Sequence, residues 1–227
     1  MISHAHKCIF IHIPKTAGSS INSFFHPDVK FHFKNADYDR LFGWCPKRKL
    51  HMQHATASQL LETELISEEI WNTYYKFTFV RNPWDRSYSD YLWMKQFANI
   101  KDSFKNYMRQ AGDFTTILND NTKDTFLGDH ILGQHKFFDL KGPLEVDFLG
   151  RFENFSNDIQ TVLKTVGINR QFNRNLNKSK RKFNHYSRFY SNSNRDLVLE
   201  KYRKDIELFG YDFEDKRTGL YKLKSLL

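Results

Sequence analysis

The chain has 227 residues, with 35 lysines and arginines against 26 aspartates and glutamates, and a formal net charge of +9. This length suits a single domain over residues 1–227, and the charge favours anionic partners such as nucleic acid, phosphorylated cofactors, acidic glycans or membrane surfaces. The only two cysteines, Cys8 and Cys45, indicate neither a disulfide framework nor a zinc site. No apolar run approaches the roughly 20 residues of a membrane span.

The first informative segment is a strand, a loop and a helix near the N-terminus. Residues 7–13 (KCIFIHI) are almost continuously apolar, as in a strand buried on both faces. Pro14 interrupts this run, and Lys15 follows it with a mobile positive charge. The small residues that can wrap closely around an anion are Thr16, Ala17, Gly18, Ser19 and Ser20. Apolar residues at helical spacing over 21–25 then place this loop at a helix N-terminus, where N–H groups favour an anion.

A nucleotide-triphosphate loop is the main competing interpretation of this segment. That motif needs G-x-x-x-x-G-K-[ST], with the lysine after the last glycine. Here Lys15 precedes Gly18, and no glycine comes before Lys15. The loop therefore suits a single phosphate or a phosphosulfate, although a nucleotide or small-molecule kinase stays open as an alternative.

The next part of the chain is less regular. Residues 28–50 lack periodicity, with a possible short strand over 31–33. Thr56 or Ser58 is expected to cap one helix, and Ser67 another.

A second strand, turn and helix follows over residues 75–97. Residues 75–80 (YKFTFV) predict a buried strand, and Pro83 suits the first position of a helix over 83–97. Arg81 leaves the strand end and Ser89 lies two turns into the helix, so both could hold a phosphate. The alternative is a local ion pair between Arg81 and Asp85, with Ser89 neutral.

The remaining elements are predicted more coarsely. A helix is expected over 101–110, and the broken polar stretch 112–145 could form part of a substrate cleft. Residues 146–152 predict a strand, and the apolar spacing from Ile159 to Val166 predicts a helix that ends at Gly167. A basic loop over about 169–190 precedes a last helix at about 194–210, closed by Gly210. The alternation of strands and helices argues for an α/β fold with a parallel sheet covered on both faces.

The two strand–loop–helix segments together resemble the phosphosulfate-binding motifs of carbohydrate sulfotransferases, including the relatives that sulfate heparan and chondroitin. The resemblance implies that residues 14–20 bind the 5′-phosphosulfate of 3′-phosphoadenosine 5′-phosphosulfate, and that Arg81 and Ser89 bind its 3′-phosphate. It implies a three-layer α/β/α fold like that of P-loop nucleotide kinases. Animal relatives are membrane-anchored Golgi enzymes. This chain begins almost directly in a core strand, so we expect a soluble, cytoplasmic and bacterial protein instead.

Sulfuryl transfer needs a charge on the leaving phosphate to be stabilised and a proton to be taken from the acceptor hydroxyl. Lys15 is the candidate for the first role, by analogy with phosphoryl transfer, and no metal is expected. His54 is the preferred base because it abuts a helix start and resembles the base of the heparan and chondroitin relatives. The alternatives, apart from a surface or capping role for His54, are His51, His130, His135 and Glu153.

The basic run over 169–188 contains no acidic residue. By resemblance, its residues Lys178, Ser179 and Lys180 contact the 3′-phosphate or the adenosine. A solvated loop, or one that steers an acidic glycan, explains the same charges.

The sequence thus predicts a sulfotransferase with a nucleotide cosubstrate and a saccharide or similar hydroxyl acceptor. A basic nucleic-acid-binding module is the third hypothesis, suggested by the charge and by 22 Phe, 11 Tyr and 4 Trp. No recognised nucleic-acid motif occurs, so we expect no nucleic-acid partner. The sequence leaves the acceptor's identity and the oligomeric state open.

Overall fold

The computed structural model describes residues 1–138, 146–174 and 181–224, and its centre is a four-stranded sheet in the order β1-β2-β5-β6. The strands are β1 (Ile2–Ser3), β2 (Cys8–Ile11), β5 (Tyr75–Val80) and β6 (Phe148–Arg151). β2, β5 and β6 are parallel, whereas β1 pairs antiparallel with β2. The predicted parallel sheet is therefore corrected to a mixed sheet. The short connection over residues 4–7 returns the chain as a hairpin, which antiparallel strands allow and parallel strands do not.

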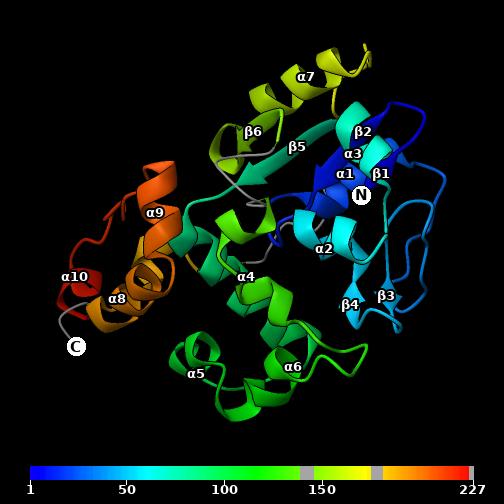
Figure 1. The fold of residues 1–227 in the computed structure, drawn as a ribbon. Coiled ribbons are helices and arrows are strands. Elements are labelled where there is room, and N and C mark those ends of the chain that lie inside the picture. The colour runs from blue at the N-terminus through cyan, green and yellow to red at the C-terminus, as the bar shows by residue number, and fades with distance from the viewer. Residues whose placement is uncertain (139–145, 175–180, 225–227) are drawn as a thin grey trace.

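Alternating residues of β2 pack into different apolar clusters, as expected for a strand buried on both faces. Phe10 stacks on Phe77 of β5 and shares its cluster with the buried residues of α1 (Gly18–Phe25) and α7 (Phe155–Thr165). Ile9 and Ile11 belong to the other cluster, which collects α2 (Ala57–Glu62), α3 (Glu68–Thr73), the hairpin of β3 (Trp44–Cys45) and β4 (Leu50–His51), and α9 (Arg203–Phe209). Figure 1 shows α7 and α9 well apart, with the sheet between them.

A third, largely aromatic cluster lies around α4 (Pro83–Phe97), which follows β5. Asn82 caps α4 by accepting the N–H groups of Trp84 and Asp85, and Pro83 occupies the first turn, as predicted. The cluster unites α4 with α5 (Phe104–Arg109), α6 (Thr115–Asn119) and α8 (Asn192–Lys201). In Figure 1, α4 leads away from the sheet towards α5 and α6, with α8 to one side. The last helix of the described chain is α10 (Leu220–Lys224).

Several local predictions are confirmed. Thr56 and Gln59 form a reciprocal capping box at the start of α2, with bonds of 3.2 and 3.0 Å. Ser67 caps α3 by accepting the N–H of Ile70. Gly167, with a φ of 75°, ends the turn after α7.

Two predicted elements differ in the structure. Residues 31–33 form no strand but run into a turn at Phe33, whose carbonyl accepts the N–H of Trp44. The predicted last helix is interrupted at Tyr202, which separates α8 from α9. Within the residues that the structure describes, no helix is long and apolar enough to cross a membrane.

Candidate active site

A cavity of about 1040 Å³ opens where β2 and β5 end. Two predicted site segments, far apart in the chain, meet in its wall: the loop after β2 and the start of α4. The sequence-predicted residues that line it are Lys15, Ala17, Gly18, Ser19, Ser20, His54, Arg81 and Ser89. Lys178, Ser179 and Lys180 lie outside the described residues. The neighbouring Arg174 and Arg181 do line the cavity.

The loop after β2 has an unusual backbone. Lys15 and Ala17 both have positive φ values, 72° and 75°, which are uncommon for residues with a side chain. Such left-handed positions turn successive N–H groups towards one point, and the carbonyl of Ala17 accepts the N–H groups of Ser20 and Ile21 but not those of Gly18 and Ser19. Thr16 is fully buried and donates its hydroxyl to the carbonyl of Ile13 at 2.7 Å, so its side chain supports the loop. Backbone N–H groups and Ser19 remain to receive an anion.

Gly18 lies directly against His12. A Cβ placed on Gly18 would lie 1.8 Å from Nε2 of His12, so only glycine fits here. The His12 ring also stacks on Phe10, at 5.3 Å between centroids, which fixes it on the sheet. The loop can therefore run close to the sheet and carry Lys15 to the cavity.

Lys15 is half-enclosed by aromatic and charged groups. Its Nζ lies 5.0 Å from the centroid of the Trp93 ring. Burial lowers the pKa of Lys15 to about 8, with Asp90 opposing this shift and Arg81 and Arg181 adding to it. Lys15 is thus still mostly protonated at neutral pH, and a bound anion would favour its charged form.

Arg81 is engaged in several contacts. Its guanidinium donates to Asp85 at 2.6 and 2.9 Å and to the carbonyl of Lys15 at 2.9 Å, and lies 4.0 Å over the Phe152 ring. Arg181 binds the other oxygen of Asp85. Burial raises the pKa of Asp85, but the two arginines outweigh it and hold that pKa below its usual value. The ion pair between Arg81 and Asp85, which the sequence offered as an alternative, is therefore present. Arg81 and Ser89 nevertheless line the cavity.

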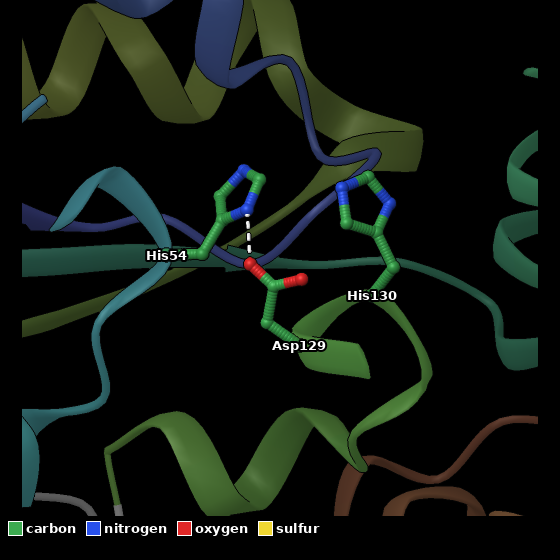
Figure 2. Close-up of side chains that lie close together, drawn as sticks. All are labelled: His54, Asp129 and His130. Atoms are coloured by element: carbon green, nitrogen blue, oxygen red, sulfur yellow. Dashed lines mark hydrogen bonds and ion pairs between the residues drawn. The ribbon is translucent and has the colours of Figure 1, made fainter. Parts of the chain in front are cut away.

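His54 and Asp129 form a histidine–carboxylate dyad (Figure 2). Nδ1 of His54 and Oδ2 of Asp129 are 2.6 Å apart, on side chains that are only 10% and 13% exposed. Burial lowers the pKa of His54 to about 4, although Asp129 opposes this shift. Because Asp129 accepts at Nδ1, the neutral ring keeps its proton there and presents Nε2 as a base. The structure thus gives His54 the tautomer that proton abstraction requires.

A second histidine–carboxylate pair stands beside the first. Nδ1 of His130 bonds to Asp90 at 2.7 Å, and Asp90 also accepts the hydroxyl of Tyr107 at 2.8 Å. The His130 ring is stacked on Trp93 at 4.8 Å and lies 5.0 Å from the His54 ring. Nε2 of His130 is buried and has no hydrogen-bond partner.

The other candidate bases are placed differently. His51 is buried and lines the cavity, but no carboxylate bonds to its ring nitrogens as Asp129 does to His54. His135 bonds to Asp205, outside the cavity lining. Glu153 accepts the N–H of Asn82 and the hydroxyl of Tyr211, and it does not line this cavity either. His54 and His130, each with Nδ1 bonded to a carboxylate at the cavity, are thus set apart from His51, His135 and Glu153.

The residues His54, Asp129 and His130 could also hold a metal ion. One potential ligand atom from each lies within 4.8 Å of the others, and two imidazoles with one carboxylate suit a transition metal. In the structure, however, Nδ1 of His54 is committed to Asp129 and Nδ1 of His130 to Asp90. Sequence reasoning found no such cluster, because Asp129 and His130 lie more than seventy residues beyond His54. The signal in the sequence for this cluster was the adjacent pair of an acidic residue and a histidine, Asp129 and His130.

Comparison with known proteins assigns the chain to a family. The loop that carries Lys15, the Arg81 guanidinium and the His54 ring all border one cavity. The sulfotransferase family model matches residues 1–212, and the chain belongs to that family.

Three relatives illustrate the similarity. Carbohydrate sulfotransferase 10 of Xenopus laevis is 28% identical over 174 residues, and that of Gallus gallus is 27% identical over 178 residues. These matches cover 62% and 63% of this chain but only 48% of each relative, so the chain spans about half their length. An uncharacterized protein of Archaeoglobus fulgidus is 25% identical over 113 residues, 49% of this chain and 83% of that protein. No solved structure matches the chain significantly.

Proposed function

We propose that the protein transfers a sulfuryl group from 3′-phosphoadenosine 5′-phosphosulfate to a hydroxyl of a saccharide or similar acceptor. The observation that carries this proposal is one cavity lined both by the Lys15 loop and by the oriented base His54. Membership of the sulfotransferase family and the similarity to carbohydrate sulfotransferase 10 support it independently.

The residues present fit a nucleotide with two separate anionic groups. The loop over residues 15–20 offers backbone N–H groups and Lys15 to the phosphosulfate end. Arg81, between β5 and α4, and Ser89, within α4, offer a bidentate cation and a hydroxyl to the 3′-phosphate. Arg81 would then share its donors between that phosphate and Asp85.

The chemistry assigned to the chain's residues is a single displacement. The acceptor oxygen forms a bond to sulfur while the bond between sulfur and the bridging phosphate oxygen breaks. The acceptor's proton passes to Nε2 of His54, and Asp129 stabilises the imidazolium that forms. Lys15 stabilises the charge that develops on the leaving phosphate. No metal takes part in this scheme.

The proposal extends to the architecture. We infer that residues 1–227 act as one domain, with the basic segment near 169–190 contributing to the nucleotide site. The two apolar clusters that pack on opposite faces of β2 support a three-layer arrangement like that of nucleotide kinases. Lys178, Ser179 and Lys180 stay predicted contacts of the 3′-phosphate or adenosine.

Sulfate transfer to a panel of glycosides tests this function directly. The purified protein with the phosphosulfate donor should form sulfated glycoside and adenosine 3′,5′-bisphosphate in equal amounts. ATP in place of the donor should give no phosphorylated product. Phosphorylation with ATP and no sulfation would instead establish a kinase.

A further inference from the structure

The cavity has two ends with different chemistry, joined at Lys15. Towards one end lie Arg81, Arg181 and Asp85, with Phe152 under the Arg81 guanidinium. Towards the other end, Lys15 lies over Trp93. The three cavity-lining rings that contact one another there, which we call the aromatic rim, are Phe33, Trp93 and Phe97.

The rings of the aromatic rim contact one another and also contact His130. Trp93 stacks on His130 at 4.8 Å and on Phe97 at 4.7 Å, with planes only 6° and 16° apart. Phe33 meets Phe97 edge-on at 5.5 Å. Phe97 is 43% exposed although it is a large apolar side chain. Rings that line a cavity and stay accessible are typical of sites that receive the apolar face of a flat or cyclic ligand.

This end carries little charge. His51 and His54 both have lowered pKa values because of burial, so their rings are neutral at neutral pH. Lys34, beside Phe33, is paired with Asp124 at 3.3 Å. Among the described residues that line the cavity, Lys15 is the cation nearest to the rim, and the proposed function commits it to the donor. An acidic acceptor would therefore lose hydration here and meet only Lys34, which lies over Phe33 but is already paired with Asp124.

The unpartnered buried atoms lie next to the base. Nε2 of His130 and Oδ1 of Asp129 are both buried without a hydrogen-bond partner. Since Asp90 holds Nδ1 of His130, Nε2 is the ring nitrogen left to meet a ligand. Figure 2 shows these side chains facing one another around the dyad. Buried acceptors are costly when unsatisfied, so they suit a ligand that brings hydroxyl donors.

We propose that the acceptor is an uncharged saccharide ring that packs on the aromatic rim, with its reacting hydroxyl at His54 and an adjacent hydroxyl donating to Nε2 of His130. This inference rests on the proposed function and adds the class of acceptor. In this proposal His130 selects the acceptor by its hydroxyl pattern and Phe97 contributes to acceptor binding, while His54 acts as the base. It also excludes the acidic glycans that the net charge of the chain alone would favour.

Matched glycosides test the proposal. Sulfate transfer is measured to p-nitrophenyl glucoside, galactoside and mannoside, to the corresponding glucuronide and galacturonide, and to singly deoxygenated analogues. The kcat/KM of the best neutral glycoside should exceed that of its uronide by about tenfold or more. The buried carboxylate of the uronide would lose at least one charge-assisted hydrogen bond to water and find no replacement. Removal of one hydroxyl beside the reacting one should cost a similar factor. A preference for the uronide overturns the proposal.

Three variants separate binding from chemistry. Phe97→Ala should raise the glycoside KM by about tenfold with little change in kcat, since it removes apolar contact area. Tyr38→Ala, at a 51% exposed aromatic outside the cavity lining, is the matched control and should change neither. His130→Ala should abolish the penalty for the deoxygenated analogue, and His130→Gln, which keeps an acceptor oxygen, should restore part of it. An unchanged KM in Phe97→Ala or an unchanged penalty in His130→Ala overturns the proposal.

The donor site is measured separately, by calorimetry with adenosine 3′,5′-bisphosphate. If the protein binds the bisphosphate but neither binds nor sulfates any neutral glycoside at millimolar concentration, the acceptor proposal alone is overturned. Absence of bisphosphate binding overturns the proposed function itself. Activity that requires micromolar zinc and is lost on chelation would assign His54, Asp129 and His130 to a metal and would overturn the acceptor proposal.

Discussion

Nδ1 of His54 lies 2.6 Å from Oδ2 of Asp129, although the two residues are 75 positions apart in the chain. His54 is in the turn η1 (Met52–His54) after the β3–β4 hairpin, and Asp129 is in the turn η3 (Gly128–Ile131). Both turns border the cavity that also holds Lys15. Their contact fixes the orientation of the His54 ring at the edge of the cavity.

Asp129→Asn tests the role of the dyad. The amide can turn its NH₂ towards Nδ1 and favour the wrong tautomer of His54, so kcat should fall by about 10²-fold, within the usual contribution of a general base. The bisphosphate Kd should not change. Asp124→Asn, at an exposed carboxylate paired with Lys34, is the control. Equal effects of the two substitutions would show that Asp129 has no special role.

His54→Ala and His51→Ala distinguish the two candidate bases. His54→Ala should lose about 10²- to 10⁴-fold in kcat while it keeps bisphosphate affinity. The acid limb of kcat/KM in the wild type should lie near pH 4, since burial lowers the pKa of His54 to about 4. Below that pH the ring is protonated and cannot accept a proton. A larger kcat loss in His51→Ala than in His54→Ala would transfer the role to His51.

Deprotonation of Lys15 should set the alkaline limb of the pH–rate profile. Its pKa is lowered to about 8 by burial, so in the free enzyme the cation is lost as pH rises through 8. The kcat/KM for the donor should therefore decline above pH 8, and kcat should decline at higher pH, because a bound anion raises the lysine pKa. Lys15→Arg keeps its charge at all these pH values and should remove the alkaline limb. An unmoved limb in this variant would mean that another group titrates there.

The contact of Gly18 with His12 predicts a double-mutant cycle. Gly18→Ala places a Cβ where the His12 ring lies, so it should lower stability and weaken bisphosphate binding. The double variant Gly18→Ala with His12→Ala removes the clashing ring and should recover part of both losses, with a coupling of about 0.5–3 kcal/mol. Thermal melts and calorimetry measure the two quantities. Additive effects would contradict a direct clash.

Local signals in the sequence predicted local structure well. The strand over 75–80, the α4 helix over 83–97 and the Thr56 and Ser67 caps all follow from short-range patterns of apolar, proline and hydroxyl residues. The loop over 15–20 and Arg81 follow β2 and β5, and parallel neighbours bring their carboxyl ends to one edge of the sheet. The structure places both at one cavity.

Long-range pairings were beyond such signals. Asp129 with His54, Asp90 with His130, and Arg181 with Asp85 join residues 75, 40 and 96 positions apart. No local periodicity encodes such contacts, because they arise from how the loops pack around the cavity. The antiparallel β1 was missed for another reason: two residues are too short for a strand pattern.

The most direct test of the central claim is calorimetric titration with adenosine 3′,5′-bisphosphate and, in parallel, with ATP. The account predicts micromolar binding of the bisphosphate, much weaker binding of ATP, and loss of bisphosphate binding in Arg81→Ala with the fold retained in thermal melts. Clear binding of ATP without binding of the bisphosphate would contradict it.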